Sequence, residues 1–161
     1  MYLQSKGVDV TALDISAGAA AVMRLRGVNQ VIEQDIFTIE SGDYDTLLLL
    51  MNGIGLAGTI AGLRRFLQHA KLLIKQNGQL IFDSSDVAYL FEGTMPEGPV
   101  YYGEIAYRYE YRKEKTDWFT WLYIDRDILE RVAYEEGWIT ELLFEDEHEQ
   151  YIARLTQKEL K

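Results

Sequence analysis

Up to about Tyr89, short apolar runs alternate with stretches in which apolar residues recur every three or four positions. The runs at 8–13, 30–34, 44–51 and 79–83 predict strands. The run at 44–51 is continuously apolar rather than alternating, which indicates a strand that is buried on both faces, as in a parallel sheet.

Two helices are predicted between these strands. Ser16 can cap a helix that ends at Gly27, and Thr59 can cap a longer one that Asn77-Gly78 stops. The longer helix has one apolar stripe, formed by Ile60, Leu63, Leu67, Ala70 and Ile74. Strand, helix, strand, strand, helix, strand is the order of a doubly wound, mostly parallel α/β sheet.

The pattern changes after the loop at 92–99, which holds both prolines, Pro96 and Pro99. Aromatic and charged residues alternate along 105–112, and a second aromatic run follows at 118–124, so a hairpin is predicted within 100–124. We expect its aromatic side chains to form hairpin core, with an acceptor cup or lid as the alternative. A helix that Gly137 ends and strands at 138–144 and 150–156 complete a single domain over 1–161 with an antiparallel end.

Composition narrows the class of protein. A net charge of −10 repels phosphate backbones, so nucleic acid is not an expected partner and a small molecule fits better. The chain holds no apolar run long enough for a membrane span and no cysteine, which is compatible with a cytoplasmic location. His69 and His148 lie far apart in sequence, so no metal site is predicted.

The strand at 8–13 delivers an acid, Asp14, at its carboxyl end. In nucleotide-binding α/β folds, an acid at this place accepts hydrogen bonds from ribose hydroxyls. The alternative is that Asp14 helps to cap the helix that Ser16 begins.

The order and spacing of several segments resemble the class I S-adenosylmethionine-dependent methyltransferases. The segments are Val10-Thr11-Ala12-Leu13-Asp14-Ile15-Ser16, Gln34-Asp35-Ile36-Phe37, the run 44–52, Asn77-Gly78-Gln79-Leu80-Ile81, Gly137-Trp138 and Tyr151-Ile152-Ala153-Arg154-Leu155. The resemblance implies S-adenosylmethionine as cofactor and methyl transfer to a small acceptor. It also implies that Asp14 and Ile15 contact the ribose end of the cofactor, and that Asp35 and Ile36 contact its adenine. For Asp35, a turn residue after a strand is the alternative.

Further candidates follow the next strands. Asn52 and Gly53 lie where ligands bind in open α/β sheets, and are expected to contact the cofactor. Asp83, Tyr89 and Tyr107 are candidate contacts of the acceptor. The glycines at 53, 55 and 58 also fit G-x-G-x-x-G, which leaves an NAD(P)-dependent oxidoreductase as a second hypothesis.

One part of the family pattern has no counterpart here. The family's first strand and its glycine-rich loop would precede residue 8, where only seven residues stand. Because that strand is central in the family, we expect a truncated product, or a homo-oligomer or swapped dimer that fills the gap. A third hypothesis is therefore a non-catalytic fragment or subunit that folds only in an oligomer.

Overall fold

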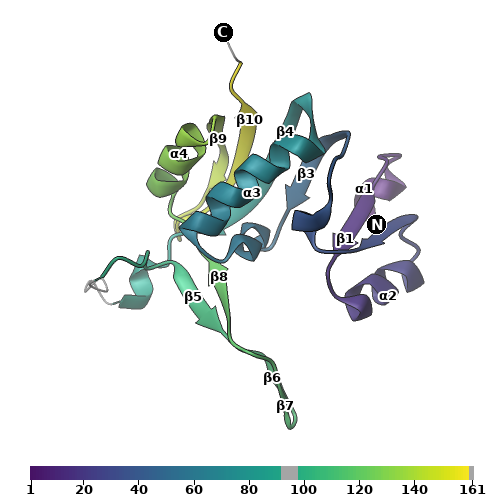
Figure 1. The fold of residues 1–161 in the computed structure, drawn as a ribbon, viewed down its shortest axis with the longest axis horizontal. Coiled ribbons are helices and arrows are strands. Elements are labelled where there is room, and N and C mark those ends of the chain that lie inside the picture. The colour runs from purple at the N-terminus through teal and green to yellow at the C-terminus, as the bar shows by residue number, and fades with distance from the viewer. Residues whose placement is uncertain (92–97, 160–161) are drawn as a thin grey trace. The chain divides into compact units, whose positions relative to one another are not determined.

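The computed structural model describes residues 1–91 and 98–159 and forms two compact units, Met1–Ser41 and Gly42–Lys161 (Figure 1). Most of the loop predicted at 92–99 lies outside the described residues. None of the described helices is long and apolar enough to cross a membrane. Whether 1–161 is a single domain stays a prediction.

The first unit is a small parallel α/β layer. Its elements are α1 (Tyr2–Ser5), β1 (Thr11–Asp14), α2 (Ala17–Leu25), β2 (Gln30–Glu33) and a 3-10 turn at Ile36–Thr38. β1 and β2 pair in parallel, with Asp14 opposite Glu33. The Ser16 hydroxyl accepts a hydrogen bond from the Ala19 N–H, which confirms the predicted cap.

The second unit is built on a mixed four-stranded sheet. Its strands, in spatial order, are β3 (Tyr44–Leu49), β4 (Ile74–Ser85), β10 (Gln150–Gln157) and β9 (Trp138–Glu145). β3 is parallel to β4, whereas β10 is antiparallel to both of its neighbours. The predicted antiparallel end of the α/β sheet is confirmed.

Two helices, α3 (Ile60–Leu73) and α4 (Arg126–Glu135), pack on this sheet, and Figure 1 shows α3 crossing it. The Trp138 indole N–H donates to the Leu67 carbonyl at 3.1 Å and joins β9 to α3. The side chains buried between helices and sheet include Leu63, Phe66, Leu67, Leu80, Phe82, Leu129, Val132, Ala153 and Leu155. Burial of this apolar surface is the main stabilising term for the unit.

The predicted end of the long helix is wrong. α3 ends at Leu73, and Ile74 is already extended and buried as the first residue of β4. Asn77-Gly78 therefore lies inside a strand, where a Cβ on Gly78 would be 3.0 Å from the Tyr44 carbonyl oxygen. The glycine permits this close approach of two strands at a register shift, rather than ending a helix.

The predicted burial of the 44–51 strand is also wrong. The strand and its parallel pairing exist, but no residue of β3 is buried and the Leu48 side chain is 45% exposed. β3 stands at the end of the strand order and is bonded only to β4 among the described strands. An end strand is less covered than a central one, whatever its sequence.

The predicted hairpin is present and has two parts. β5 (Glu104–Tyr107) pairs with β8 (Phe119–Leu122), and β6 (Glu110–Tyr111) pairs with β7 (Glu114–Lys115) at the projecting tip (Figure 1). The expected aromatic core is wrong for several rings, since Tyr107, Tyr109, Tyr111 and Trp118 are exposed. A lone two-stranded ribbon has too little partner surface to bury one face of large side chains.

Candidate active site

Asp14 and Asp35 stand at the carboxyl ends of neighbouring parallel strands in the first unit. Asp14 Oδ1 accepts the Ser16 N–H at 2.8 Å, and its other oxygen has no partner among the described residues. Asp35 Oδ1 accepts the Phe37 N–H at 3.0 Å and caps the 3-10 turn. The alternative roles are therefore present for both acids, as a cap contact of Asp14 and as a turn residue for Asp35, and each keeps a second oxygen for a ligand.

The apolar candidates differ in exposure. The Ile15 side chain is 72% exposed directly after the Asp14 carboxylate, and Ile36 is half-buried at the start of the 3-10 turn. An exposed isoleucine beside a carboxylate offers a flat ligand both an apolar surface and an acceptor. The contact roles of these residues stay predictions.

Asn52 is the centre of a hydrogen-bond network in the second unit. Its side chain donates to the Leu122 carbonyl at 3.1 Å and accepts from the Ser84 hydroxyl at 2.9 Å. Its backbone N–H donates to Asp83 Oδ2 at 2.9 Å, and its carbonyl accepts from the Trp121 indole at 3.1 Å. Both ends of the amide are used within the protein, so Asn52 positions the ends of β3, β4 and β8. Its predicted direct contact with cofactor stays a prediction.

The backbone is strained at the same place. Met51 and Asn52 have φ values of 62° and 52°, in the left-handed region that L side chains disfavour. Met51 is also 92% exposed, so packing does not hold it there. Two such residues in succession at the carboxyl end of a strand mark a segment that the surrounding contacts hold in place, as is common at functional sites.

Asp83 lies at the carboxyl end of β4, beside this segment. One carboxylate oxygen accepts the Asn52 N–H, whereas Oδ1 is buried and has no hydrogen-bond partner in the described part of the chain. A buried acceptor without a donor is costly, and a ligand N–H or O–H would remove that cost. Among the candidate contacts of the methyl acceptor, Asp83 has the strongest structural support.

The glycine loop is packed rather than open. Residues Gly53–Ala57 form a 3-10 helix, and a Cβ on Gly55 would lie 2.0 Å from the Trp121 Nε1. The indole therefore occupies the space beside Gly55 that a dinucleotide-binding loop leaves for pyrophosphate. This geometry argues against the NAD(P) hypothesis for residues 53–58.

Two tyrosines that the sequence reading missed hold the base of the hairpin. The Tyr101 hydroxyl donates to Asp125 Oδ2 at 2.6 Å and accepts the Asp125 N–H at 2.8 Å, while the Tyr102 hydroxyl donates to Asp86 Oδ1 at 2.7 Å. Burial, reinforced by the carboxylate of Asp125, raises the pKa of Tyr101, and burial likewise raises that of Tyr102. Adjacent tyrosines gave no periodic signal in the sequence, so only the fold reveals this pair.

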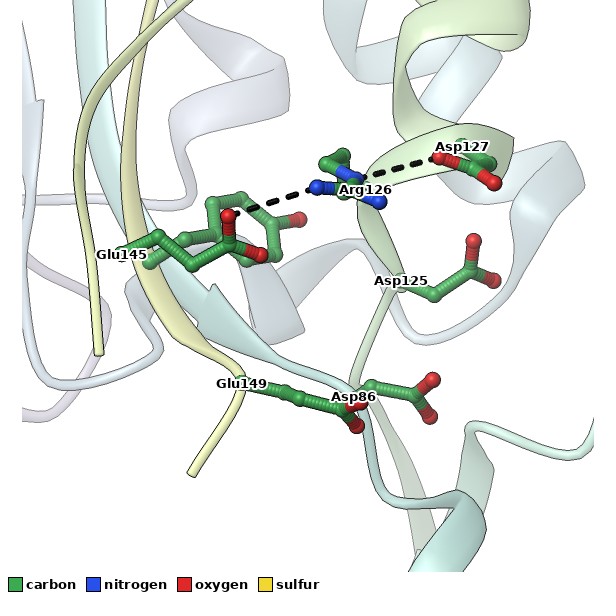
Figure 2. A pocket seen from close by; sticks show the side chains of 7 residues that line it. Asp86, Asp125, Arg126, Asp127, Glu145 and Glu149 are labelled. Atoms are coloured by element: carbon green, nitrogen blue, oxygen red, sulfur yellow. Dashed lines mark hydrogen bonds and ion pairs between the residues drawn. The ribbon is translucent and has the colours of Figure 1, made fainter. Parts of the chain in front are cut away.

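A small cavity of about 90 Å³ opens beside these groups and is lined mainly by acids. Figure 2 shows Asp86, Asp125, Glu145 and Glu149 around it, with Arg126 bonded to Asp127 and Glu145. The described residues hold no group of three or more His, Asp or Glu placed to bind a metal ion. No candidate from the sequence lines this cavity.

Tyr89 and Tyr107 do not line this cavity. Tyr107 stacks with Phe119 at 6.3 Å between ring centroids, and its hydroxyl lies 3.4 Å from that of Tyr123. That hydrogen bond and burial raise the pKa of Tyr107 to about 12, and Tyr89 is close enough to contribute. Tyr107 therefore lies on the hairpin, whereas Tyr89 lies in the 3-10 turn Ala88–Phe91 that precedes it in sequence.

Comparison with solved structures finds proteins that are similar to this chain over nearly its whole length. No protein-family model matches the chain, and a search of curated proteins finds no match. A solved structure of a SAM-dependent methyltransferase from Bacteroides fragilis, in complex with S-adenosyl-L-homocysteine, is 38% identical with a TM-score of 0.89. The match covers 98% of this chain and 66% of that protein, so the chain spans just under two thirds of its length. The chain belongs to the class I S-adenosylmethionine-dependent methyltransferases.

More distant structures agree with the methyltransferase fold. A SAM-dependent methyltransferase from Methanosarcina mazei is 14% identical with a TM-score of 0.72, over 99% of this chain and 86% of that one. One from Clostridium acetobutylicum is 12% identical with a TM-score of 0.63, over 94% and 76%. Identities this low support the fold alone. The predicted family and Rossmann-like α/β class are confirmed, whereas the absence of a central strand stays a prediction.

Proposed function

We propose that this methyltransferase-family chain binds S-adenosylmethionine and transfers its methyl group to a small acceptor. The observation that carries the proposal is the Asp14 carboxylate at the carboxyl end of β1, with one oxygen unpartnered among the described residues. It stands in a chain 38% identical to a methyltransferase crystallised with S-adenosyl-L-homocysteine.

The residues of the first unit fit the adenosine part of such a cofactor. The free oxygen of Asp14 is an acceptor for ribose hydroxyls, and the second oxygen of Asp35 is an acceptor for an adenine amino group. Ile15, exposed beside Asp14, gives an apolar surface to the same ligand. When bound, the cofactor supplies an electrophilic methyl group on a sulfonium.

The chain's own contribution is positional. Methyl transfer needs an acceptor atom held in line with the methyl group and kept apart from water, and little covalent help. The Asn52 network holds three strand ends and the Asp83 carboxylate in one arrangement. We assign no catalytic base.

Calorimetric titration of the chain with S-adenosylhomocysteine tests the proposal. Asp14→Ala is expected to weaken binding by about 10-fold or more, because two charge-assisted hydrogen bonds are lost. Asp9→Ala is the matched control, since Asp9 is an acid of the same unit, close before β1, that accepts a hydrogen bond from the Gln30 side chain. Absence of binding by the unaltered chain, or equal losses in both variants, would contradict the proposal. A response to NAD(P) instead would favour the oxidoreductase hypothesis.

A further inference from the structure

Five aromatic side chains form one continuous surface on the hairpin, which we name the aromatic surface. Ring centroids lie 5.3 Å apart for Tyr109 and Phe119, 6.3 Å for Phe119 and Trp121, and 6.4 Å for Tyr107 and Tyr123. Its members are Tyr107, Tyr109, Phe119, Trp121 and Tyr123. The register of the two strands explains why these rings lie together. Tyr107 pairs with Phe119, and Ile105 pairs with Trp121, on one face of β5–β8.

The two faces of this hairpin differ in how far they are buried. The opposite face is packed, since Leu122 is fully buried and Glu104 accepts the N–H of Ile60 at the start of α3. The aromatic surface is left open, with Tyr107 37% and Tyr109 69% exposed. Contiguous aromatic area left in water on an otherwise anchored element indicates a binding surface.

The aromatic surface is tied to the strand ends of the candidate site. The Trp121 indole packs on Gly55 and donates to the Asn52 carbonyl, while the Asn52 N–H donates to Asp83. Asn52 therefore links Trp121, in the aromatic surface, to the Asp83 carboxylate, whose other oxygen is buried without a partner among the described residues.

The charge of this region selects a cation. Aromatic ring faces carry negative potential and attract ammonium groups. The hairpin's own arginines are placed elsewhere, with Arg108 over Trp118 at 4.8 Å and Arg112 over Tyr111 at 5.3 Å. The net charge of −10 also favours a cationic ligand over an anionic one.

We infer that the aromatic surface binds the methyl acceptor, and that this acceptor is a small organic amine. The inference rests on the proposed function. The nitrogen lone pair forms the new N–C bond, the C–S bond breaks with its electron pair staying on sulfur, and the positive charge passes from sulfur to nitrogen. The amine reacts in its neutral form, so an ammonium first releases its proton to water to expose the lone pair. A primary or secondary amine releases one further proton to water after the transfer. The rings stabilise the ammonium as it forms, and the step needs no protein base.

Choline and its uncharged isostere 3,3-dimethylbutan-1-ol are matched probes, because a quaternary ammonium resembles the methylated product. Ligand-observed NMR titration of the full chain is expected to show choline binding about fivefold or more tightly than the isostere. Tyr107→Leu is expected to weaken choline binding about fivefold, and Tyr107→Phe, which keeps the ring, to retain it. Tyr111→Leu is the control, since Tyr111 is an exposed ring of the same hairpin outside the aromatic surface.

Two results would overturn the inference: no saturable choline binding, or equal binding of both probes, which would make the surface a general apolar docking face. The comparison of the two probes on the unaltered chain needs no variant to fold. Titration with S-adenosylhomocysteine separates the two proposals. Cofactor binding without choline binding rejects the amine acceptor alone, whereas choline binding without cofactor binding rejects methyl transfer.

Discussion

At the scale of single residues, Asn52 combines a strained backbone with five hydrogen bonds. Asn52→Gly keeps the left-handed backbone and loses only the two side-chain bonds, which is expected to lower the free energy of unfolding by about 1–3 kcal/mol. Asn52→Ala should cost about 1 kcal/mol more, because alanine disfavours that backbone. Met51→Gly is the control, and its relief of strain at an exposed position should not lower stability. Urea unfolding measures all three, and a fully stable Asn52→Gly would contradict the role.

Tyr151 gives stability a dependence on alkaline pH. Burial raises the pKa of its phenol, whose hydroxyl donates to the Ile124 carbonyl at 2.7 Å. Above about pH 10 the unfolded tyrosine loses its proton while the buried one keeps it, so stability falls by about 1.4 kcal/mol per pH unit for this group. Below that pH the contribution is fully present. Tyr151→Phe is therefore expected to flatten the decline in urea midpoint between pH 9 and 11. An unchanged slope would contradict this, and Tyr111→Phe, at an exposed phenol, is the control.

At the scale of elements, the packing of β8 on the 53–57 turn depends on Gly55, which has no side chain. Gly55→Ala would place a Cβ 2.0 Å from Trp121 Nε1, displace the indole and break its bond to Asn52. We expect a loss of about 1–3 kcal/mol, as for other overpacked positions. Adding Trp121→Phe, a smaller ring, should recover part of it. Gly18→Ala in α2, where only Ser16 Oγ lies near at 3.7 Å, should be neutral or stabilising in the same thermal unfolding assay.

Local chemistry explains which elements could be predicted from the sequence. The caps at Ser16 and Thr59 act within four residues of the chain, and both are present in the structure. The burial of β3 and the aromatic hairpin depended on neighbours far away in sequence, which periodicity does not specify. The same holds for the site. Asp14 and Asp83 lie at the carboxyl ends of strands, where the sequence pattern predicts candidates, and their roles stay predictions. Ser84 and Tyr101 act through partners 32 and 24 residues away in sequence, which no local pattern indicates.

At the scale of the whole molecule, the free edge of β3 is its main liability. Among the described strands β3 is bonded only to β4, and Leu48 and Leu50 at this edge are 45% and 52% exposed. An unpaired apolar edge is a template for another strand, as in the expected homo-oligomer or swapped dimer. Static light scattering is therefore expected to give a mass above the 18.6 kDa of one chain, rising with concentration.

Leu48→Lys tests whether that edge makes the assembly. A charge beside the unpaired backbone groups opposes strand addition, so the variant should shift the mass toward one chain. Leu72→Lys is the control, since Leu72 is a leucine of α3 with a similar exposure of 56%. A single-chain mass at all concentrations, or equal effects of both variants, would reject association through β3. If the assembly persists and S-adenosylhomocysteine does not bind, a non-catalytic subunit accounts for the chain better than an enzyme. If Leu48→Lys is monomeric and still binds S-adenosylhomocysteine, β3 pairing and cofactor binding are separate properties.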